Sequence, residues 1–501
     1  MNIFIALLFI LTVLTVRFLS KWYKIFLIGL KIPGPIVLPM VGNIQMVSKL
    51  KPENLLLSLR NLREIYGQTY RLWLGPELWV FLHTPQETRD VLNNRNLLRP
   101  QAFQYLDALI GNGLLISEGN HWATHRRILE PAFNINILNT FSESISSHSD
   151  IFINKIRAHG EKCLDITAYI LPCIMDTIIR EYYTSMGRNL QIQLNENEAY
   201  TQAFHRSNEL LFQRMTNPLL FLDIIYRLTP MYSELKKSLK IIHGLMSDIV
   251  RERQNYLATN GHATTTGKIG KTFLDTLLTP TNTGKVFSFQ DIREEVNTFV
   301  LAGVDTTTSA MCYVLYALAK YPQEQQKVFE EMQNIQQSSK LSANVDFNEL
   351  QKYKYLDLFI KECLRFYTVV PLTGRQTTSS TRIGERVYPA GVTVWINLYG
   401  LAHDPHLFED PDEFRSLRFA EEKSLIAFSY LPFSGGPHIC IGRKYALMIM
   451  KIMTIKILEQ FQLVLADPQE NLILMAEMVL KFKNGINLIF KEREKSSIIN
   501  H

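Results

Sequence analysis

Cysteine is scarce in this chain, with 5 residues among 501. No two of them form a CxxC pair, and they stand at scattered positions, namely Cys163, Cys173, Cys312, Cys363 and Cys440. An odd number of cysteines at such spacings argues against a disulfide framework and against a structural zinc site. We therefore expect the bulk of the chain to face a reducing compartment.

A strong net charge and biased tracts are also lacking. The formal net charge is +6, and no basic run is interleaved with aromatic residues, so nucleic acid is not an expected partner. A slightly basic face for an acidic protein partner remains plausible. With 47% hydrophobic residues and no repeat, the sequence predicts an ordered globular protein that is large enough to bury a cofactor.

One long apolar run is present, at the N-terminus. Ile3 to Val16 is almost wholly apolar, and it is followed by a basic segment, Arg17 to Lys24, and a second apolar patch, Ile25 to Leu30. A bilayer span needs about 20 residues, so either the span extends past Arg17 or the second patch lies in the interface. Positive charge after the run, with no cleavage or presequence pattern, predicts a retained anchor over residues 1–31. We expect the endoplasmic reticulum membrane, with the body in the cytosol.

Prolines separate this anchor from the rest of the chain. Residues 32–40 begin Ile-Pro-Gly-Pro and predict a stiff, non-helical hinge. Beyond it, Tyr70–Leu74 and Leu78–Leu82 predict a β-hairpin, and most of the chain after the hairpin has a helical pattern. No composition shift marks a second domain, so we expect residues 41–501 to form a single one.

The densest cluster of turn residues surrounds one cysteine. Phe433 to Gly442 reads FSGGPHICIG, and Arg443 to Met450 has a helical pattern. A thiolate at Cys440 would lie beside the N-terminus of that helix, where free N–H groups and the helix dipole lower a thiol pKa and favour metal ligation. Gly435 and Gly436 let the backbone lie close against a flat group. On composition alone, a buried free cysteine is the simpler interpretation, so other motifs have to decide.

A second pattern places an aromatic and a basic residue four positions apart. Trp122 and Arg126 share one face of a predicted helix, where an indole N–H and a guanidinium can bind one carboxylate. An exposed arginine beside a packed tryptophan is an equally compatible interpretation. His121 and His125 have the same spacing, but two ligands are too few for a metal site, so we interpret them as surface residues.

A long helix is predicted from Asp291 to Lys320, where Pro322 ends it. Its middle, Ala302 to Ser309, combines glycine with four hydroxyl side chains and an acid, which weakens a helix, so we expect a local distortion there. Asp305 and Thr306 could act together as a proton relay. The alternative is a threonine-rich helix contact with a solvated Asp305.

Glu362 and Arg365 stand three positions apart on another predicted helix. Such spacing is typical of an ordinary surface ion pair. An extended apolar turn, Val369 to Leu372, comes next and leads to Arg375.

These motifs together resemble the cytochrome P-450 superfamily. The cysteine loop is similar to the haem-binding signature Phe-x-x-Gly-x-Arg-x-Cys-x-Gly through Phe433, Gly436, Cys440 and Gly442, with His438 where the family usually has arginine. The other matches are the Trp-x-x-x-Arg pair, the oxygen-binding helix motif at 302–307, and Glu-x-x-Arg with Arg418 of the Phe414–Phe419 segment. Asp291–Val296, His125–Arg127 and Val370–Leu372 make the chain most like the membrane-bound fourth family.

The resemblance implies a role for each matching residue. Cys440 would ligate the haem iron within the Phe433–Gly442 loop, and the propionates would meet four side chains, those of Trp122, Arg126, Arg375 and His438. A neutral imidazole at His438 would pair with a propionate more weakly than arginine, and in a pH-sensitive way. Glu362, Arg365 and Arg418 would form a structural lock. Ala302 replaces the glutamate that bonds haem covalently in many members of this branch, which implies non-covalent haem b.

The implied fold is mainly α with small β-sheets, a helix-rich triangular prism with haem between the long central helix and the cysteine loop, preceded by the membrane anchor. The implied function is a monooxygenase that inserts one atom of O2 into a C–H bond of a lipophilic substrate such as a fatty acid, a hormone-like lipid or a xenobiotic. NADPH would supply electrons through a membrane-bound cytochrome reductase that docks near Arg443 and Lys444, with cytochrome b5 as a second possible donor.

Two alternatives stay open. A haem isomerase or dehydratase on the same fold would not need the relay of Asp305 and Thr306. A non-catalytic haem sensor or lipid carrier is the other, and His438 is the one feature that favours either. The substrate pocket is expected between Leu106–Leu115, Val300–Val304, Val369–Leu372 and Met478–Leu480, and these apolar walls do not identify the substrate.

Overall fold

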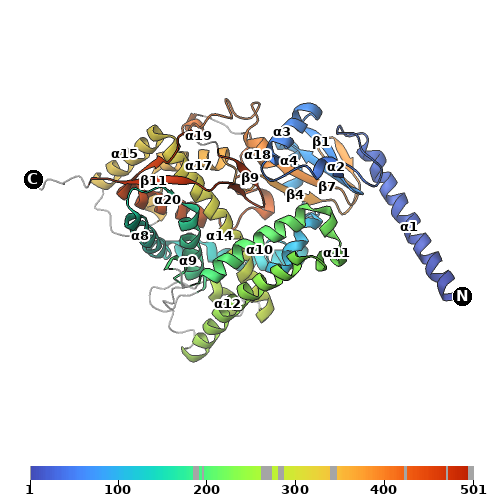
Figure 1. Ribbon diagram of the computed structural model, residues 1–501, viewed down its shortest axis with the longest axis horizontal. Helices are drawn as coiled ribbons and strands as arrows, with labels where there is room; N and C mark the ends of the chain where they lie inside the picture. The colour runs from blue at the N-terminus through green and yellow to red at the C-terminus, as the bar shows by residue number, and fades with distance from the viewer. Residues whose placement is uncertain are drawn as a thin grey trace, which may run out of the picture.

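The computed structural model of the protein describes residues 2–183, 191–194, 197–260, 273–279, 287–338, 347–421, 426–469 and 472–494 (Figure 1). Helices dominate, as the sequence predicts. Those of the first half are α1 (Asn2–Gly29), α2 (Ile44–Val47), α3 (Leu55–Tyr66), α4 (Pro85–Asn93), η1 (Gln101–Leu106), α5 (Asp107–Ile110), α6 (Gly119–Leu129), η2 (Glu130–Phe133), α7 (Ile135–Asn139), α8 (Ser142–His159), α9 (Thr167–Tyr183), η3 (Ile192–Leu194), α10 (Glu198–Thr216), η4 (Pro218–Phe221), α11 (Asp223–Arg227) and α12 (Pro230–Asn260).

The second half continues this pattern. Its helices are α13 (Phe273–Leu278), α14 (Phe289–Lys320), α15 (Pro322–Ser338), α16 (Phe347–Leu350), α17 (Lys354–Phe366), α18 (Leu398–Ala402), α19 (Arg418–Glu421), η6 (Gly436–His438) and α20 (Arg443–Gln460). The strands of the whole chain are β1 (Thr69–Leu74), β2 (Glu77–Leu82), β3 (Leu164–Asp165), β4 (Leu372–Gln376), β5 (Thr381–Ile383), β6 (Arg386–Tyr388), β7 (Thr393–Asn397), β8 (Phe461–Leu465), β9 (Leu474–Ala476), β10 (Leu480–Phe482) and β11 (Asn487–Glu492).

Helix α14 is the centre of the helical part of the molecule. Ser288 and Asp291 form a capping box at its start, and the helix ends before Pro322, close to the predicted limits. It packs against α9, α12, α17 and α20, and most of its side chains belong to the main hydrophobic core. It is long and apolar enough to cross a membrane, but 72% of that window is buried, so it is a core helix.

The threonine-rich middle of α14 does not interrupt the helix. Residues 302–309 are α-helical throughout, so the distortion expected from the sequence is not seen as a break. The Thr306 hydroxyl donates to the Ala302 carbonyl oxygen at 2.7 Å, an intrahelical bond that lets a hydroxyl side chain stay within a helix.

The strands form small sheets beside the helices. The largest has the order β1–β2–β7–β4, in which β2 and β7 are parallel and the other neighbours antiparallel. Its first two strands are the predicted hairpin, whereas β7 and β4 come from far along the chain. The other sheets are β3–β11–β8 and the two-stranded β9–β10 and β5–β6.

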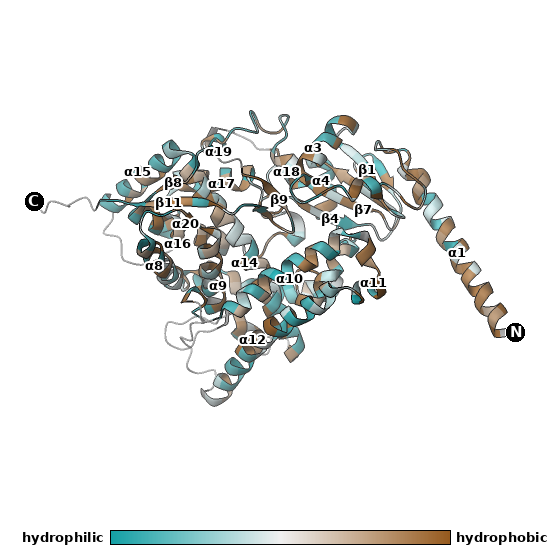
Figure 2. Cartoon of the chain, viewed as in Figure 1, coloured by the Kyte–Doolittle hydropathy of each residue, from teal (hydrophilic) through white to brown (hydrophobic). Residues whose placement is uncertain are grey.

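The predicted anchor, α1, is one continuous helix that projects from the body and is apolar over its free half (Figure 2). One face of its last turns is covered, because the rings of Trp22 and Phe26 pack against Trp73 of β1, with ring centroids 6.2 and 5.6 Å away. Ile25 is also buried there. Part of the second apolar patch therefore docks on the sheet, while Leu27 and Leu30 stay exposed.

The proline segment after the anchor is fastened to the same sheet. Arg71 of β1 donates from its backbone N–H to the Pro33 carbonyl oxygen, and from its guanidinium to the carbonyls of Gly29 and Pro35, at 2.8 to 2.9 Å. Because a Cβ on Gly34 would lie 2.5 Å from the Arg71 carbonyl oxygen, only glycine fits at this crossing. These bonds fix the direction in which α1 leaves the body.

Candidate functional site

The cysteine loop connects η6 to α20 through a tight backbone path. Gly436 has φ +67°, and a Cβ there would lie 2.2 Å from the carbonyl oxygen of Leu92, so the position requires glycine. The backbone N–H of Cys440 donates to the Phe433 carbonyl oxygen at 3.0 Å, and Gly442 is the N-cap of α20. The loop therefore presents Cys440 beside a helix N-terminus, as predicted.

Part of the Cys440 surface is open to solvent, but many protein atoms surround its thiol group. Burial raises its pKa, and this effect outweighs the backbone N–H groups of Gly442 and Arg443 and the charge of Arg126, which lower it. The expectation of a lowered thiol pKa is therefore wrong for the protein atoms alone, because desolvation of a thiolate exceeds the help of the helix end. A bound metal ion deprotonates a coordinating thiol outright, so this does not argue against ligation.

Aromatic residues connect the cysteine loop to the middle of α14. The Phe133 ring stacks on Phe299, with centroids 5.5 Å apart, and it lies 4.0 Å from the Cβ position of Gly442. Phe299 stands one helical turn before Ala302 and Gly303. The loop and the oxygen-binding motif expected from the sequence are therefore close in space.

Helix α6 reaches the cysteine loop with the two residues that the sequence singled out. Arg126 donates to the Ile439 carbonyl oxygen at 2.9 Å, one residue before the cysteine. The ring of Trp122 lies against His438, with centroids 3.9 Å apart. Trp122 and Arg126 thus face the loop, and the interpretation as an arginine merely exposed beside a packed tryptophan does not hold, because Arg126 is mostly buried.

Further arginines lie around His438. Its pKa is lowered to about 3, first by burial and then by the charges of Arg99, Arg375, Arg126 and Arg95. Burial and the neighbouring Arg375 also lower the pKa of Arg99 to about 9. We call these four arginines with His438 the cationic cluster. Sequence reasoning missed Arg95 and Arg99, because neither belongs to a recognisable motif. Arg99 is distinguished only by its place directly before Pro100.

The cationic cluster holds more positive charge than its protein partners balance. Within the described residues, the Nε of Arg99 and the Nδ1 of His438 are buried without a hydrogen-bond partner. Two acids lie near the cluster: Glu118 accepts from the Arg99 backbone N–H at 2.6 Å and raises the pKa of both Arg99 and Arg375, and an exposed Glu130 lies 3.9 Å from Arg126. Buried cations need anionic partners, so this cluster beside a cysteine fits a planar cofactor with two carboxylates and an iron centre.

The acid of the predicted relay has a partner that the sequence did not indicate. Lys481 of β10 lies 3.4 Å from an Asp305 oxygen and 3.2 Å from Glu477. Burial by itself would lower the pKa of Lys481, but the two carboxylates outweigh it, and the pKa is raised. Thr306 follows Asp305 on α14, and Lys481 holds the Asp305 carboxylate from β10.

The predicted lock residues converge in the core. Arg365 donates from Nε and Nη2 to the two oxygens of Glu362 at 2.8 and 2.7 Å, and Arg418 donates to the same carboxylate at 3.4 Å. All three side chains are 1% exposed or less, so the surface-pair interpretation is wrong. Other N–H groups of the same two arginines donate to the backbone carbonyl oxygens of Ala402, Glu409, Asp410, Pro411 and Glu413.

One sequence-based interpretation has to be corrected. His125 is not a surface residue, because it is only 2% exposed and its Nδ1 lies 2.6 Å from Glu295 of α14. The i,i+4 spacing showed that His121 and His125 share a face but not that this face turns towards α14. Among the described residues, no group of three or more His, Cys, Asp or Glu side chains could hold a metal ion.

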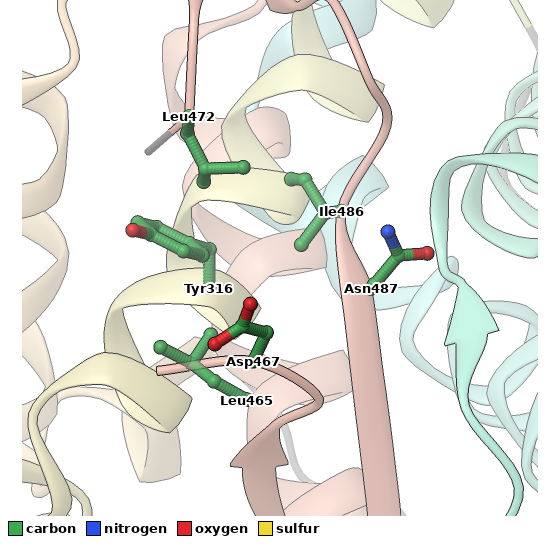
Figure 3. A pocket seen from close by; sticks show the side chains of 6 residues that line it. All are labelled: Tyr316, Leu465, Asp467, Leu472, Ile486 and Asn487. Carbon is green, nitrogen blue, oxygen red and sulfur yellow. The ribbon is translucent and has the colours of Figure 1, made fainter. Parts of the chain in front are cut away.

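A small pocket elsewhere does not belong to this site. It lies between the C-terminal part of α14 and strands β8 and β11, and Figure 3 shows its lining side chains, Tyr316, Leu465, Asp467, Leu472, Ile486 and Asn487. It has room for about one water molecule, and none of the predicted site residues lines it.

Comparisons with known proteins agree with this geometry. The family model "Cytochrome P450" matches residues 32–490. The chain is 33% identical to "Cytochrome P450 4d2" of Drosophila melanogaster over 476 residues, which cover 92% of this chain and 94% of that protein. It is 33% identical to "Cytochrome P450 4V2" of Homo sapiens over 447 residues, with 85% and 84% covered. A solved cytochrome P450DA heme domain has the same fold, with a TM-score of 0.78 at 21% identity over 92% of this chain and 98% of that one.

Proposed function

The chain belongs to the cytochrome P450 family and is a monooxygenase of that family, and from this premise we propose that it binds haem b through Cys440 and hydroxylates a lipophilic substrate, such as a long-chain fatty acid, at a membrane. The observation that carries the proposal is the cationic cluster beside Cys440. A sulfur ligand and a surplus of positive charge, buried at Arg375 and exposed at Arg95, meet the needs of an iron porphyrin with two propionates.

When bound, haem would supply the activation of dioxygen and the transfer of one oxygen atom to a C–H bond, with two electrons and two protons reducing the other atom to water. The protein has to deliver those protons. The Thr306 hydroxyl gives its hydrogen to the Ala302 carbonyl, so its oxygen lone pairs are free to accept from water. Lys481 is 24% exposed and Asp305 13% exposed. In this proposal the two side chains pass protons from the surface towards Thr306, with water between Asp305 and the Thr306 hydroxyl.

The neutral imidazole at His438 has a physical explanation in this proposal. Four arginines already surround the position where the family usually has a fifth. A further guanidinium would add charge repulsion, whereas a neutral ring can stack on Trp122 and still offer one hydrogen bond to a propionate.

Electrons would come from NADPH through a cytochrome reductase, with cytochrome b5 as a second possible donor. Arg443 and Lys444 at the start of α20 are exposed, and they come shortly after Cys440 in the chain. Exposed basic side chains this close to the iron ligand suit an acidic redox partner that has to approach the cofactor.

Membrane attachment is proposed from two features. Helix α1 is long and apolar enough to cross a bilayer and, in that window, is not buried in the body. The segment of η4 and α11 also exposes large apolar side chains, namely Leu219, Leu222, Ile224 and Leu228. An exposed apolar patch of this kind suits contact with lipid, and the endoplasmic reticulum is the membrane that we propose.

The haem is expected to be removable without breaking a covalent bond. Ala302 has only a methyl side chain and cannot form an ester with the porphyrin. We predict that acid acetone transfers the haem of the purified protein into the organic phase. Haem that remains with the denatured chain would contradict this prediction.

The alternative functions are an isomerase or dehydratase and a non-catalytic haem or lipid carrier. Neither needs a proton route, and the chain has Asp305 and Thr306 at the middle of α14, with Lys481 of β10 beside Asp305. This observation favours the monooxygenase.

The test is turnover under 18O2. Protein reconstituted with a reductase, NADPH and saturated fatty acids of graded chain length should give a product with one 18O atom per molecule. Thr306→Val keeps the side-chain shape but removes the hydroxyl, so the yield of product per NADPH should fall on the order of 10²-fold. An oxygen-free isomerised or dehydrated product, or equal yields from both proteins, would refute the proposal.

A further inference from the structure

A buried hydrogen-bonded pair of side chains joins α6 to α14 and has no part in the proposed chemistry. The Nδ1 of His125 lies 2.6 Å from Oε1 of Glu295, and the two side chains are 2% and 0% exposed. A carboxylate oxygen accepts, so with Glu295 ionised Nδ1 carries the hydrogen of this short bond. Replacing either residue would leave the other buried without its partner.

The direction of the Glu295 carboxylate is fixed by a loop. Its second oxygen accepts from the backbone N–H of Leu114 at 3.1 Å. The neighbouring Glu294 accepts from the Asn112 N–H at 2.9 Å, so two successive acids of α14 hold residues 112–114. A Cβ on Gly113 would lie 1.9 Å from Oγ1 of Thr298, which shows how closely this loop lies on the helix.

The rotation of α6 about its axis follows from the His125 contact. Residues four apart share a helix face, and the next residue points about 100° further round. The rings of His121 and His125 meet at a tilt of 34° with centroids 3.9 Å apart, and the Phe287 ring meets His125 edge-on with centroids 4.9 Å apart, so the His125 side of α6 is packed against α14 and the residues just before it. The neighbouring face, with Trp122 and Arg126, therefore points at the cysteine loop.

We propose that His125 and Glu295 are positioning residues for the cofactor edge. The loop at 112–114 holds Glu295, Glu295 holds His125, and His125 sets the rotation of α6 at which Trp122 and Arg126 meet the haem propionates. The inference rests on the proposed binding of haem at Cys440. It assigns a role to a pair of residues that do not themselves touch the cofactor.

The experiment measures the rate at which holoprotein loses haem to an excess of apomyoglobin. His125→Leu removes the donor at similar size and should accelerate haem loss about tenfold, the effect of one lost charge-assisted hydrogen bond. His125→Asn places an amide N–H near the position of Nδ1 and should stay close to the wild-type rate. Glu295→Gln keeps the shape but loses the charge and should also accelerate haem loss, which provides a second test if His125→Leu does not fold.

A matched control separates positioning from general stability. Gln325 of α15 is 2% exposed and donates to the carbonyls of Leu318 and Leu463 at 2.9 Å. Gln325→Leu should lower the melting temperature without changing the rate of haem loss. If His125 acts through Arg126, the double variant His125→Leu/Arg126→Leu should lose haem no faster than Arg126→Leu alone.

The outcomes are distinct. A wild-type rate for both His125→Leu and Glu295→Gln, equal acceleration by Gln325→Leu, or full additivity of the double variant would overturn the inference. A wild-type protein that takes up no haem would instead refute the proposed function.

Discussion

Replacing Glu362 with alanine is expected to destabilise the protein by about 3–5 kcal/mol, because it leaves the buried guanidinium groups of Arg365 and Arg418 without their carboxylate. Glu362 accepts from Arg365 twice, from Arg418 and from the Arg415 backbone N–H at 2.9 Å. Among the described residues, the other hydrogen bonds of Arg365 go to backbone carbonyl oxygens, so no second carboxylate can take the place of Glu362.

The effect should extend to the cofactor loop. Through their carbonyl contacts, Arg365 and Arg418 hold the chain between Ala402 and Glu413. Closer to the loop, the hydroxyl of Tyr430 donates to the carbonyl oxygen of Lys361 on α17, at 3.0 Å. Loss of the lock should therefore loosen the segment that leads to Cys440 and lower the fraction of protein that retains haem.

Urea denaturation of the two proteins measures this effect, with Glu64→Ala as the matched control. Glu64 also pairs with an arginine on a helix, at 3.5 Å from Arg60, but the two side chains are 65% and 49% exposed. Its removal should change the free energy of unfolding by no more than about 0.5 kcal/mol. Similar values for the two variants would show that the Glu362 pair does not act as a lock.

The sequence predicted the features that are encoded locally. The hairpin at Tyr70–Leu82, the limits of α14 and the start of α20 follow from turn residues, capping residues and a proline, all within a few positions of the element that they define. The cysteine loop was found in the same way, from its turn residues, and Gly436 has a positive φ and no room for a Cβ.

The features that the sequence could not predict depend on contacts between distant segments. The hairpin gains two further strands, β7 and β4, from more than 280 residues later in the chain, and no local pattern indicates that pairing. Arg99 and Lys481 became candidate site residues only when folding brought them to His438 and Asp305. His125 was misjudged because helical spacing shows which residues share a face but not what covers it.

Burial is the second quantity that local patterns do not provide. The N-terminus of α20 beside Cys440 predicts a lowered thiol pKa. Desolvation of the thiolate outweighs this effect, and the pKa of Cys440 is raised. In the same way, three-residue spacing suggests an ordinary surface pair at Glu362 and Arg365, whereas both are buried. The sign and the size of an electrostatic effect depend on how much water remains around the charge.

Replacing Cys440 with serine is expected to have the largest effect on the cofactor. The Cys440 sulfur is the iron ligand that we propose, and a serine hydroxyl does not provide a thiolate. The cationic cluster and Trp122 are untouched by this change, so some haem should still bind in the variant. Its spectrum should differ in kind and not only in amount.

Cys163→Ser is the matched control, because Cys163 is also accessible but has no place in the site. This variant should keep the spectrum of the wild-type protein. A loss of the same spectral feature in both variants would point to general damage and not to ligation by Cys440.

The most direct test of the central claim, a thiolate–iron bond at Cys440, is the absorption spectrum of the reduced protein treated with carbon monoxide. We expect the red-shifted Soret band of thiolate-ligated haem in the wild-type and Cys163→Ser proteins, and its absence in Cys440→Ser. A wild-type protein without that band, or a Cys440→Ser variant that keeps it, would show that Cys440 is not the iron ligand.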